Sequence, residues 1–290
     1  MNLVSVIIPC FNSGLTINQT VDSVREQTYP NIEIIIIDDG SDDPVTLEIL
    51  KNIADVMLIQ QPNSGLPAAR NRGCEAASGD FILPLDSDDW LETDAVYELV
   101  SVLEKTPHAS FSFSNIYLEG DRRGVLKKQY NYFEQLFLNQ IPYSILMPKE
   151  LWSKVGGYDP TMQNGYEDWE FNIRLGSEGH FGVVAKKPLF HYRVRSTGML
   201  LSKSNKMHTK LWSEIQEKHN KIYNLKMLVK TWTVWRFNPS TYPLIAYFFW
   251  FLLHKFLPKN VFNVAFGLLL NMSQSRRISR KLVDSSIKDS

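Results

Sequence analysis

The sequence predicts an α/β fold, in which a mostly parallel sheet carries helices on both faces and a helical extension follows. Three observations lead to this prediction. Short apolar runs alternate with helix-periodic segments in the first third, carboxylate clusters follow two of these runs, and the composition changes after residue 204. A length of 290 residues, 44% apolar and 21% charged, accommodates one large domain with an appendage or two modest domains.

Four short apolar runs predict strands, and the density of the first run indicates that its strand is buried on both faces. They occupy residues 3–9, 32–37, 56–60 and 81–85, and the second is nearly pure isoleucine, a β-branched residue that favours strands. The intervening segments predict helices over 14–27, 45–53 and 66–77, and a helix near 95–103 precedes a strand at 111–118. This order implies βαβ units, whose ligands bind beyond the carboxyl ends of the strands.

After residue 120 the pattern becomes irregular, with scattered glycine, proline and aromatic residues. We expect a short strand near 143–147, a helix over 166–175 and a charged amphipathic helix over 205–230. Residues 1–204 hold 17 basic and 27 acidic side chains, whereas residues 205–290 hold 14 basic and 4 acidic ones. The sequence therefore predicts a catalytic domain at 1–204 and a basic, aromatic-rich helical extension at 205–290.

The region 242–270 contains two apolar pieces, each shorter than the roughly 20 residues of a membrane-spanning helix. A basic cluster follows it, formed by Arg276, Arg277, Arg280 and Lys281. Short aromatic helices beside basic residues are typical of an interfacial anchor on an anionic membrane. The alternative is a buried helical pair that packs on the catalytic domain or on a second subunit.

Composition and missing motifs argue against several classes of protein. The acidic first part disfavours a nucleic-acid partner. Cys10 and Cys74 show neither a disulfide pattern nor metal spacing, which is typical of a reducing compartment, and we identify no signal peptide. The sequence lacks GxxxxGK[ST], GxGxxG after a strand, GxSxG and HExxH, which disfavours an NTPase, dehydrogenase, hydrolase or metalloprotease.

A cluster of carboxylates, Asp86 to Asp89, follows the strand predicted at 81–85. Alternate side chains at a strand end point the same way, so Asp86 and Asp88 can converge on one point. Two carboxylates suit Mg²⁺ or Mn²⁺, which would hold a diphosphate and take up its charge as it leaves. The alternative is a solvated acidic turn that caps the next helix.

Two further polar segments follow the second and third predicted strands. Asp39 can accept a hydrogen bond from a base or ribose beside the permissive Gly40, although a plain turn uses the same residue types. Arg70 can reach a phosphate or a base, or it is ordinary surface charge. Gly73 and the neighbouring alanines allow the predicted helix to pack closely on the sheet.

Glu167 and Asp168 open the helix predicted at 166–175 and precede Trp169. A carboxylate placed there can act as the general base for an acceptor hydroxyl, or it simply caps the helix beside a buried tryptophan. His191 is either a third metal ligand or a packed, hydrogen-bonded side chain.

Taken together, these segments resemble the family 2 glycosyltransferases, which have the GT-A fold, invert the anomeric configuration and carry a DxD motif. Six segments occur in the same order over residues 3–195. They are VIIPCFN (6–12), IDDGS (37–41), NSG with ARNRG (63–65 and 69–73), LDSDD (85–89), GGYD (156–159) and YED (166–168). The resemblance does not cover residues 205–290.

The resemblance implies a nucleotide site at the carboxyl ends of the strands. Asp39 would bind uracil or a related base, Pro9 and Asn12 would line the pocket, Arg70 would help to hold the nucleotide and Asp86 would lie near the ribose.

The resemblance also implies a metal site and a base. Asp86 and Asp88 would hold Mn²⁺ or Mg²⁺, with Asp88 as the principal ligand, and Asp168 would deprotonate the acceptor. Arg195 stands where many relatives have histidine, which leaves His191, Arg193 and Arg195 as alternatives for a further contact to the metal or the diphosphate.

The implied enzyme is an inverting glycosyltransferase of polysaccharide or surface-glycan biosynthesis. It would transfer a sugar from a nucleoside diphosphate sugar, a UDP-sugar, to a hydroxyl of a saccharide or lipid-linked saccharide. The QxxRW motif of processive members is absent, which favours transfer of a single sugar. The expected location is cytoplasmic and peripheral, on the inner face of the cell membrane through the C-terminal region.

Two other functions compete with this one. A sugar nucleotidyltransferase also uses a metal and an α/β sheet, but it needs a glycine-rich basic loop near the first strand, which residues 9–14 lack. A degenerate sugar-nucleotide-binding module would have lost carboxylates that this sequence retains.

Overall fold

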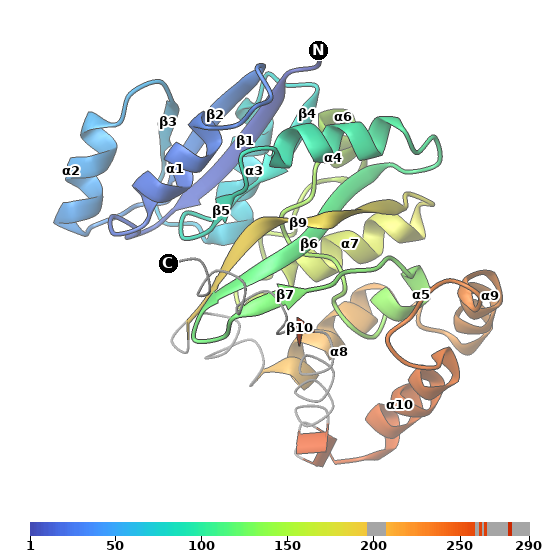
Figure 1. Cartoon of the computed structure of the whole chain (residues 1–290). Helices are drawn as coiled ribbons and strands as arrows, with labels where there is room; N and C mark the ends of the chain where they lie inside the picture. The colour runs from blue at the N-terminus through green and yellow to red at the C-terminus, as the bar shows by residue number, and fades with distance from the viewer. Residues whose placement is uncertain (196–206, 259–260, 263, 266–277, 280–290) are drawn as a thin grey trace, which may run out of the picture.

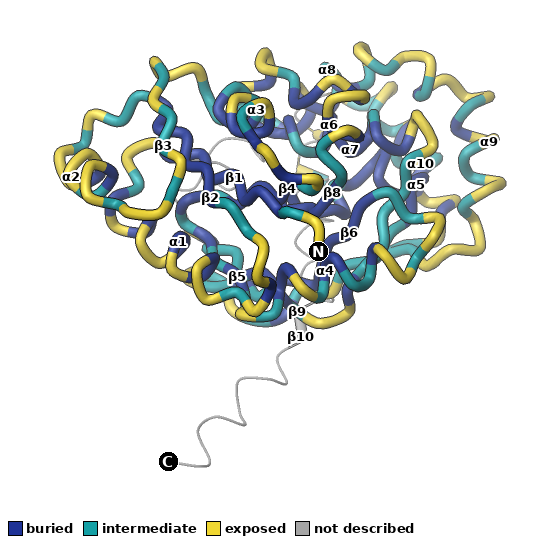
Figure 2. The backbone as a smooth tube through the Cα atoms, turned by 90° about the horizontal axis from the view of Figure 1, so that it is seen from above, coloured by how far each residue is buried: buried dark blue, intermediate teal, exposed yellow. Residues whose placement is uncertain are grey.

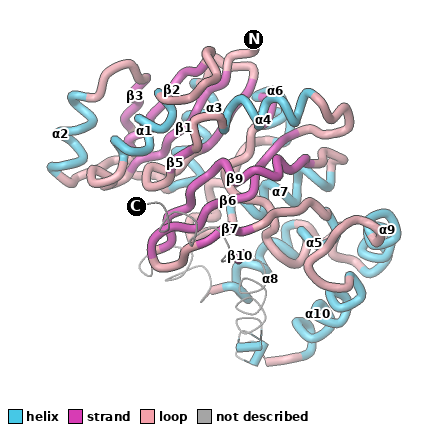
Figure 3. The backbone as a smooth tube through the Cα atoms, viewed as in Figure 1, coloured by secondary structure: helices cyan, strands magenta, loops and turns pink. Residues whose placement is uncertain are grey.

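The structure is a computed structural model of the chain, and it describes residues 1–195, 207–258, 261–262, 264–265 and 278–279. Two β-sheets form its centre and helices surround them, as Figures 1 and 3 show. Most strand residues are buried, whereas the turns and outer helix faces are exposed (Figure 2).

The first sheet consists of four parallel strands and one short antiparallel strand, in the order β3-β2-β1-β4-β8. The strands are β1 (Val4–Cys10), β2 (Ile32–Asp38), β3 (Met57–Gln60), β4 (Phe81–Pro84) and β8 (Met147–Pro148). Cys10 pairs with Asp38 and Ile7 pairs with Pro84, so the carboxyl ends share one edge. This arrangement confirms the predicted parallel sheet, but the strand expected at 143–147 is wrong, because only the short β8 forms there.

Helices cover both faces of the first sheet. They are α1 (Ile17–Arg25), α2 (Pro44–Asn52), α3 (Leu66–Ala76), α4 (Ala95–Glu104), α6 (Lys149–Val155) and α7 (Glu167–Ser177). Val6 and Ile8 of β1 belong to one hydrophobic core with α1 and α4, whereas Ile7 belongs to a second core with α3, α6 and α7. The two-residue period of a strand therefore divides β1 between two apolar layers, as the unbroken apolar run predicts.

Helix α3 lies very close to the sheet. A β-carbon added at Gly73 would overlap the Cγ2 methyl of Ile7 and lie 3.2 Å from Cγ1 of Ile37. Ala69, one turn earlier, is completely buried. The expectation that Gly73 and the alanines permit close packing is confirmed.

The second sheet has the strand order β10-β7-β6-β9-β5. Its strands are β5 (Trp90–Leu91), β6 (Phe111–Gly120), β7 (Gly124–Leu126), β9 (Gly182–Val194) and β10 (Ile278–Ser279). A bridge between Ser112 and Leu146 links β6 to the segment that enters β8 of the first sheet. Trp90 in β5 pairs with His191 in β9, so the end of β9 runs beside the acidic segment at 86–89.

The C-terminal helices share a third hydrophobic core with the first part of the chain. They are α8 (His208–Lys218), α9 (Leu225–Trp235) and α10 (Leu244–Phe256), and they pack on α5 (Tyr132–Gln135) and α7. Trp212 and Phe251 from the extension lie in this core with Phe137, Trp169 and Ile173. The single helix expected over 205–230 is instead α8 and the first half of α9, separated by a break.

The apolar region at 242–270 is described only in part. Its helix α10 has 13 residues and buries one face in the third core. Within the described ranges, no helix is both long and apolar enough to cross a bilayer. The four residues of the basic cluster, Arg276, Arg277, Arg280 and Lys281, lie outside the described residues.

Candidate active site

The end of β2 carries a buried carboxylate that fixes the approach to α3. Asp39 Oδ1 accepts hydrogen bonds from the Ser64 amide at 2.9 Å and from Gln61 Nε2 at 2.7 Å, and Oδ2 accepts one from the Gly65 amide at 2.9 Å. Gly65 has φ 88°, a backbone conformation that glycine adopts without strain. Asp39 therefore shapes the NSG turn, and its role toward a base stays a prediction.

Asn12 connects the loop after β1 to the loop after β2. Its Oδ1 accepts hydrogen bonds from the Asp42 and Asp43 amides, both at 3.0 Å, and its φ of 52° lies in the left-handed region. Such a conformation is more common for asparagine than for most other residues. Pro9 lies two residues before this loop region, buried in β1 opposite Ile37.

Arg70 of α3 connects the two acidic motifs that the sequence singles out. Its Nη2 lies 2.7 Å from Asp86 Oδ1, and its Nη1 lies 2.6 Å from Glu167 Oε1. The guanidinium is 1% exposed and lies over the ring of Tyr143, 4.8 Å from its centroid. Burial opposes the charge, but the two carboxylates outweigh it and raise the pKa of Arg70. Arg70 is therefore not surface charge.

The three aspartates after β4 have different environments. Asp89 is buried, and its carboxylate accepts hydrogen bonds from Tyr143 Oη at 2.6 Å and from the Arg193 amide at 2.7 Å. The Asp88 carboxylate accepts no hydrogen bond from another residue in the described parts of the chain. Asp89 therefore holds the segment in place, whereas Asp88 presents a half-buried carboxylate with unused oxygens.

Electrostatics favour a cation beside Asp88. Burial raises the pKa of Asp88, and the nearby Asp86 charge raises it further, while Arg195 and Arg193 oppose the shift. A bound cation would relieve both the desolvation and the carboxylate repulsion. Two carboxylates with free oxygens fit a hard divalent ion that keeps other positions for phosphate and water. The described residues contain no group of three His, Cys, Asp or Glu side chains that alone could hold a metal.

The start of α7 supplies the predicted base. Tyr166 precedes the helix with φ 69°, a strained conformation for a tyrosine, and Gly165 before it has φ 102°. Burial raises the pKa of Glu167 to about 7, although Arg70 opposes this shift. Burial also raises the pKa of Asp168, and a 2.9 Å hydrogen bond from Asn139 Nδ2 opposes it.

Arg70 forms ion pairs with Glu167, which precedes Asp168, and with Asp86, which follows β4. The predicted metal and base motifs, far apart in the sequence, are thus held in one arrangement.

His191 lies in a stack of rings between Trp90 and Tyr117, with centroid distances of 4.8 and 4.5 Å. Its Nε2 lies 2.7 Å from Glu92 Oε1 and its Nδ1 lies 3.3 Å from Glu119 Oε1. Both ring nitrogens thus face these carboxylates, which favours the packed, hydrogen-bonded alternative.

Arg193, two residues later, contacts the acidic segment directly. Its Nε donates to the Asp88 carbonyl at 2.9 Å, and its guanidinium lies over Trp90. Arg195 is exposed, and its charge acts on Asp88. These two cations are the described candidates for a contact to a diphosphate.

Sequence patterns missed Tyr143 and Asn139, which complete the site. Tyr143 Oη accepts from the Asp86 amide at 2.9 Å and donates to Asp89, so it fixes the acidic segment. Both residues lie in the irregular region after 120, where no periodicity marks a side chain as functional. Tyr143 and Asn139 lie close together in the sequence, but this closeness does not indicate a functional site.

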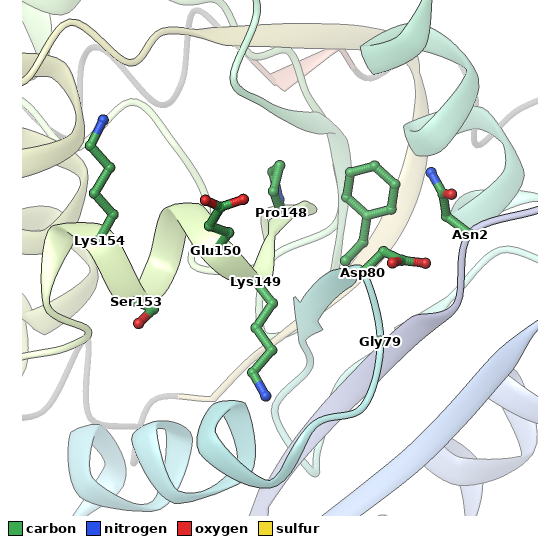
Figure 4. Close-up of a pocket in the computed structure, with 9 residues that line it drawn as sticks. Asn2, Gly79, Asp80, Pro148, Lys149, Glu150, Ser153 and Lys154 are labelled. Atoms are coloured by element: carbon green, nitrogen blue, oxygen red, sulfur yellow. The ribbon is translucent and has the colours of Figure 1, made fainter.

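An open cavity of about 710 Å³ lies at a different place, near the amino ends of β1 and β4. Lys149, Glu150 and Lys154 line it from α6, and Asn2 and Asp80 lie on the opposite side (Figure 4). None of the predicted site residues lines this cavity. The chemistry therefore points to the carboxyl edge of the sheet and not to the cavity.

A parallel sheet whose strands end in carboxylates, with a basic side chain beside them, is typical of α/β enzymes that bind a phosphorylated or nucleotide ligand. The sequence profile of glycosyl transferase family 2 matches residues 5–163, more than half of the chain. The chain belongs to glycosyl transferase family 2.

Relatives and a solved structure agree with this assignment. An uncharacterized glycosyltransferase of Haemophilus influenzae is 31% identical over 227 residues, covering 73% of this chain and 86% of the relative. The Escherichia coli UDP-Glc:alpha-D-GlcNAc-diphosphoundecaprenol beta-1,3-glucosyltransferase WfaP is 43% identical over 124 residues, covering 42% of this chain and 49% of WfaP. The chain spans 30% of glycosyltransferase GlyA of Streptococcus pneumoniae.

The crystal structure of Staphylococcus aureus TarS 1–349 in complex with UDP-GlcNAc superposes with a TM-score of 0.59 at 19% identity. It covers 82% of this chain and 75% of that one. At this identity the likeness concerns the fold, and it confirms the predicted GT-A class.

Proposed function

We propose that this chain transfers a single sugar from a UDP-sugar to a hydroxyl of a saccharide or lipid-linked saccharide, with inversion of configuration. The observation that carries the proposal is the cluster in which Arg70 holds both Asp86 and Glu167, next to the free carboxylate of Asp88 and the half-buried Asp168. WfaP, named for a UDP-Glc donor and a diphosphoundecaprenol acceptor, supports the choice of donor and acceptor. The UDP-GlcNAc complex of TarS supports the same donor class.

In this mechanism Asp168 takes the proton of the acceptor hydroxyl. The acceptor oxygen forms a bond to the anomeric carbon while the bond from that carbon to the diphosphate oxygen breaks. The bonding pair leaves with the nucleoside diphosphate, and a single displacement inverts the configuration. The raised pKa of Asp168 makes its carboxylate a stronger base than an exposed aspartate.

The residues present fit a divalent metal, Mn²⁺ or Mg²⁺. Asp88 and the second oxygen of Asp86 would hold it, because neither has a protein donor among the described residues. When bound, such an ion stabilises the charge that develops on the departing diphosphate. Arg193 and Arg195 add positive charge near Asp88.

The nucleotide would occupy the edge formed by the loops after β1 and β2. Asn12 fixes the backbone there, Asp39 shapes the NSG turn, and Pro9 gives the end of β1 a rigid, buried base. We assign Asp39 to the base of the nucleotide and Asp86 to its ribose side, as the family resemblance implies. The proposed place of action is the inner face of the cell membrane, where a lipid-linked acceptor would be presented.

The test is turnover of Asp168→Asn. With an asparagine of the same shape we expect the rate of transfer to fall by about 10²–10⁴-fold, while donor affinity stays within about twofold. Asp22→Asn, on the exposed face of α1, is the matched control and should keep full rate. Full turnover in Asp168→Asn, or retention of configuration in the product, would overturn the mechanism.

A further inference from the structure

Helix α10 has two apolar faces, and only one of them is buried. Leu244, Tyr247 and Phe251 lie in the third core, where Tyr247 is 5.4 Å from Phe137 between ring centroids. The opposite face exposes four large side chains to 65%, 65%, 47% and 81%: Ile245, Phe249, Leu252 and Phe256. Their spacing of four, three and four residues places them in one stripe along the helix.

Helix α9 extends this apolar surface at the same end of the molecule. It contacts α10 through Trp232 and Phe248, whose ring centroids are 6.1 Å apart. On α9 and just after it, Val234 is 64% exposed and Phe237 is 85% exposed. Figures 1 and 2 show α9 and α10 together at the end of the molecule that lies away from α2. Exposed apolar side chains gathered in this way mark an interaction site.

The segment that carries this surface has only basic residues among its Asp, Glu, Lys and Arg side chains. Residues 219–258 contain no aspartate or glutamate, and they contain five basic residues, namely Lys221, Lys226, Lys230, Arg236 and Lys255. All five are exposed. The partner of this surface should therefore be apolar in its interior and negatively charged at its surface.

We infer that the exposed face of α9 and α10 docks on an anionic lipid bilayer, with α10 lying in the plane of the interface. The proposed function gives the reason for such docking, because a lipid-linked acceptor would be presented at the membrane surface, but the evidence for docking does not depend on it. Helix α10 is about 20 Å long, and its buried face remains on the protein. The stripe can therefore enter the boundary between headgroups and acyl chains while the lysines meet anionic headgroups.

A second copy of this chain is a poorer occupant. A two-fold interface places the same patch of both subunits together, so the five cations of one subunit would face those of the other with no carboxylate between them. An anionic lipid surface supplies the missing negative charge.

The test is flotation of the full chain with vesicles of phosphatidylcholine alone or mixed with phosphatidylglycerol. We expect binding to the anionic vesicles and weak binding to the neutral ones. Phe249→Ser combined with Phe256→Ser should lower the apparent partition coefficient by about tenfold or more. Lys230→Gln combined with Lys255→Gln should lower it by about fivefold per charge at low salt. Tyr97→Ser, a substitution of an exposed aromatic residue on α4, is the matched control and should bind as the wild type does.

The same variants keep this inference separate from the proposed function. Both double variants should hydrolyse or transfer from the donor at wild-type rate when the acceptor is water-soluble. Unchanged flotation of the Phe249→Ser, Phe256→Ser variant would overturn the inference. A dimeric wild type together with a monomeric Phe249→Ser, Phe256→Ser variant would assign the face to a second copy, and would also overturn the inference. A lower melting temperature with unchanged flotation would show that other residues of the chain cover the face, and would also overturn it.

Discussion

At the scale of single residues, Arg70 is the most consequential side chain of the site. It is buried, and it forms an ion pair with one carboxylate from each of the two acidic motifs. Removing one member of a buried ion pair leaves uncompensated charge, which costs far more than the pair itself contributes. Its position thus links the stability of the fold to the geometry of the site.

We predict that Arg70→Met lowers the free energy of unfolding by about 3–5 kcal/mol, because Asp86 and Glu167 lose their shared cation. Arg70→Lys should cost less but still lose transfer activity, since an ammonium cannot serve both carboxylates with a rigid fork. Urea unfolding followed by circular dichroism measures the stability of both variants, and a transfer assay measures the activity of Arg70→Lys. Arg72→Met, exposed on the same helix, should change stability by less than about 0.5 kcal/mol. An Arg70→Met loss below about 1 kcal/mol would contradict this account.

Asn139 sets the pH range of the proposed base. Its hydrogen bond to Asp168 favours the carboxylate and lowers the pKa of Asp168, against the burial that raises it. Activity needs the ionised form, so it is lost as the pH falls through this pKa. In Asn139→Leu the donor is gone, the pKa of Asp168 rises, and the acid limb of the kcat/KM profile should move to higher pH. Asn52→Leu, on the exposed side of α2, should leave the profile unchanged, and an acid limb that moves to lower pH would refute the assignment.

At the scale of elements, the close contact of α3 with β1 and β2 determines where Arg70 points. Gly73 is the residue that permits this contact, since any side chain there meets Ile7. The apolar runs and the glycine could be recognised in the sequence because they obey local periodicity. Tyr143 and Asn139 could not, because their positions depend on how the irregular region after residue 120 folds against the sheets.

Gly73→Ala should destabilise the chain by about 1–3 kcal/mol, although alanine favours helices more than glycine does. The added methyl group must displace α3 from the sheet or deform Ile7. A double-mutant cycle with Ile7→Ala checks the cause, because the combined loss should be smaller than the sum of the single losses. If the two losses of stability were additive, the effect of Gly73→Ala would not arise from its contact with Ile7.

At the scale of the whole molecule, the C-terminal helices and the first part of the chain contribute side chains to one hydrophobic core. Trp212 is fully buried, and its indole donates to the Leu136 carbonyl at 3.2 Å. The different charge of residues 1–204 and 205–290 indicated a separate extension. Charge composition describes the surface of each part, and it does not show which apolar side chains of the two parts pack together. In 205–235 the aromatic residues of this core stand among charged ones, and in 242–253 every residue is apolar, aromatic or proline. Neither pattern shows which side chains join the shared core.

Trp212→Ala should therefore lower the free energy of unfolding by about 3–5 kcal/mol and leave one cooperative transition. Far-UV circular dichroism and tryptophan fluorescence should give the same midpoint in urea. Phe237→Ala, at a side chain that is 85% exposed, is the control and should change stability by less than about 0.5 kcal/mol. Two separate transitions in the wild type would mean that the extension folds independently.

The most direct test of the proposed site is calorimetric binding of a panel of UDP- and GDP-sugars with Mn²⁺ and then with EDTA. We predict that one UDP-sugar binds with Mn²⁺, that EDTA weakens this binding by about tenfold or more, and that Asp88→Ala abolishes the metal dependence. Asp22→Ala should bind as the wild type does. Equal binding in EDTA and in Asp88→Ala, with the protein folded, would contradict the assignment of Asp86 and Asp88 to a metal that holds the diphosphate.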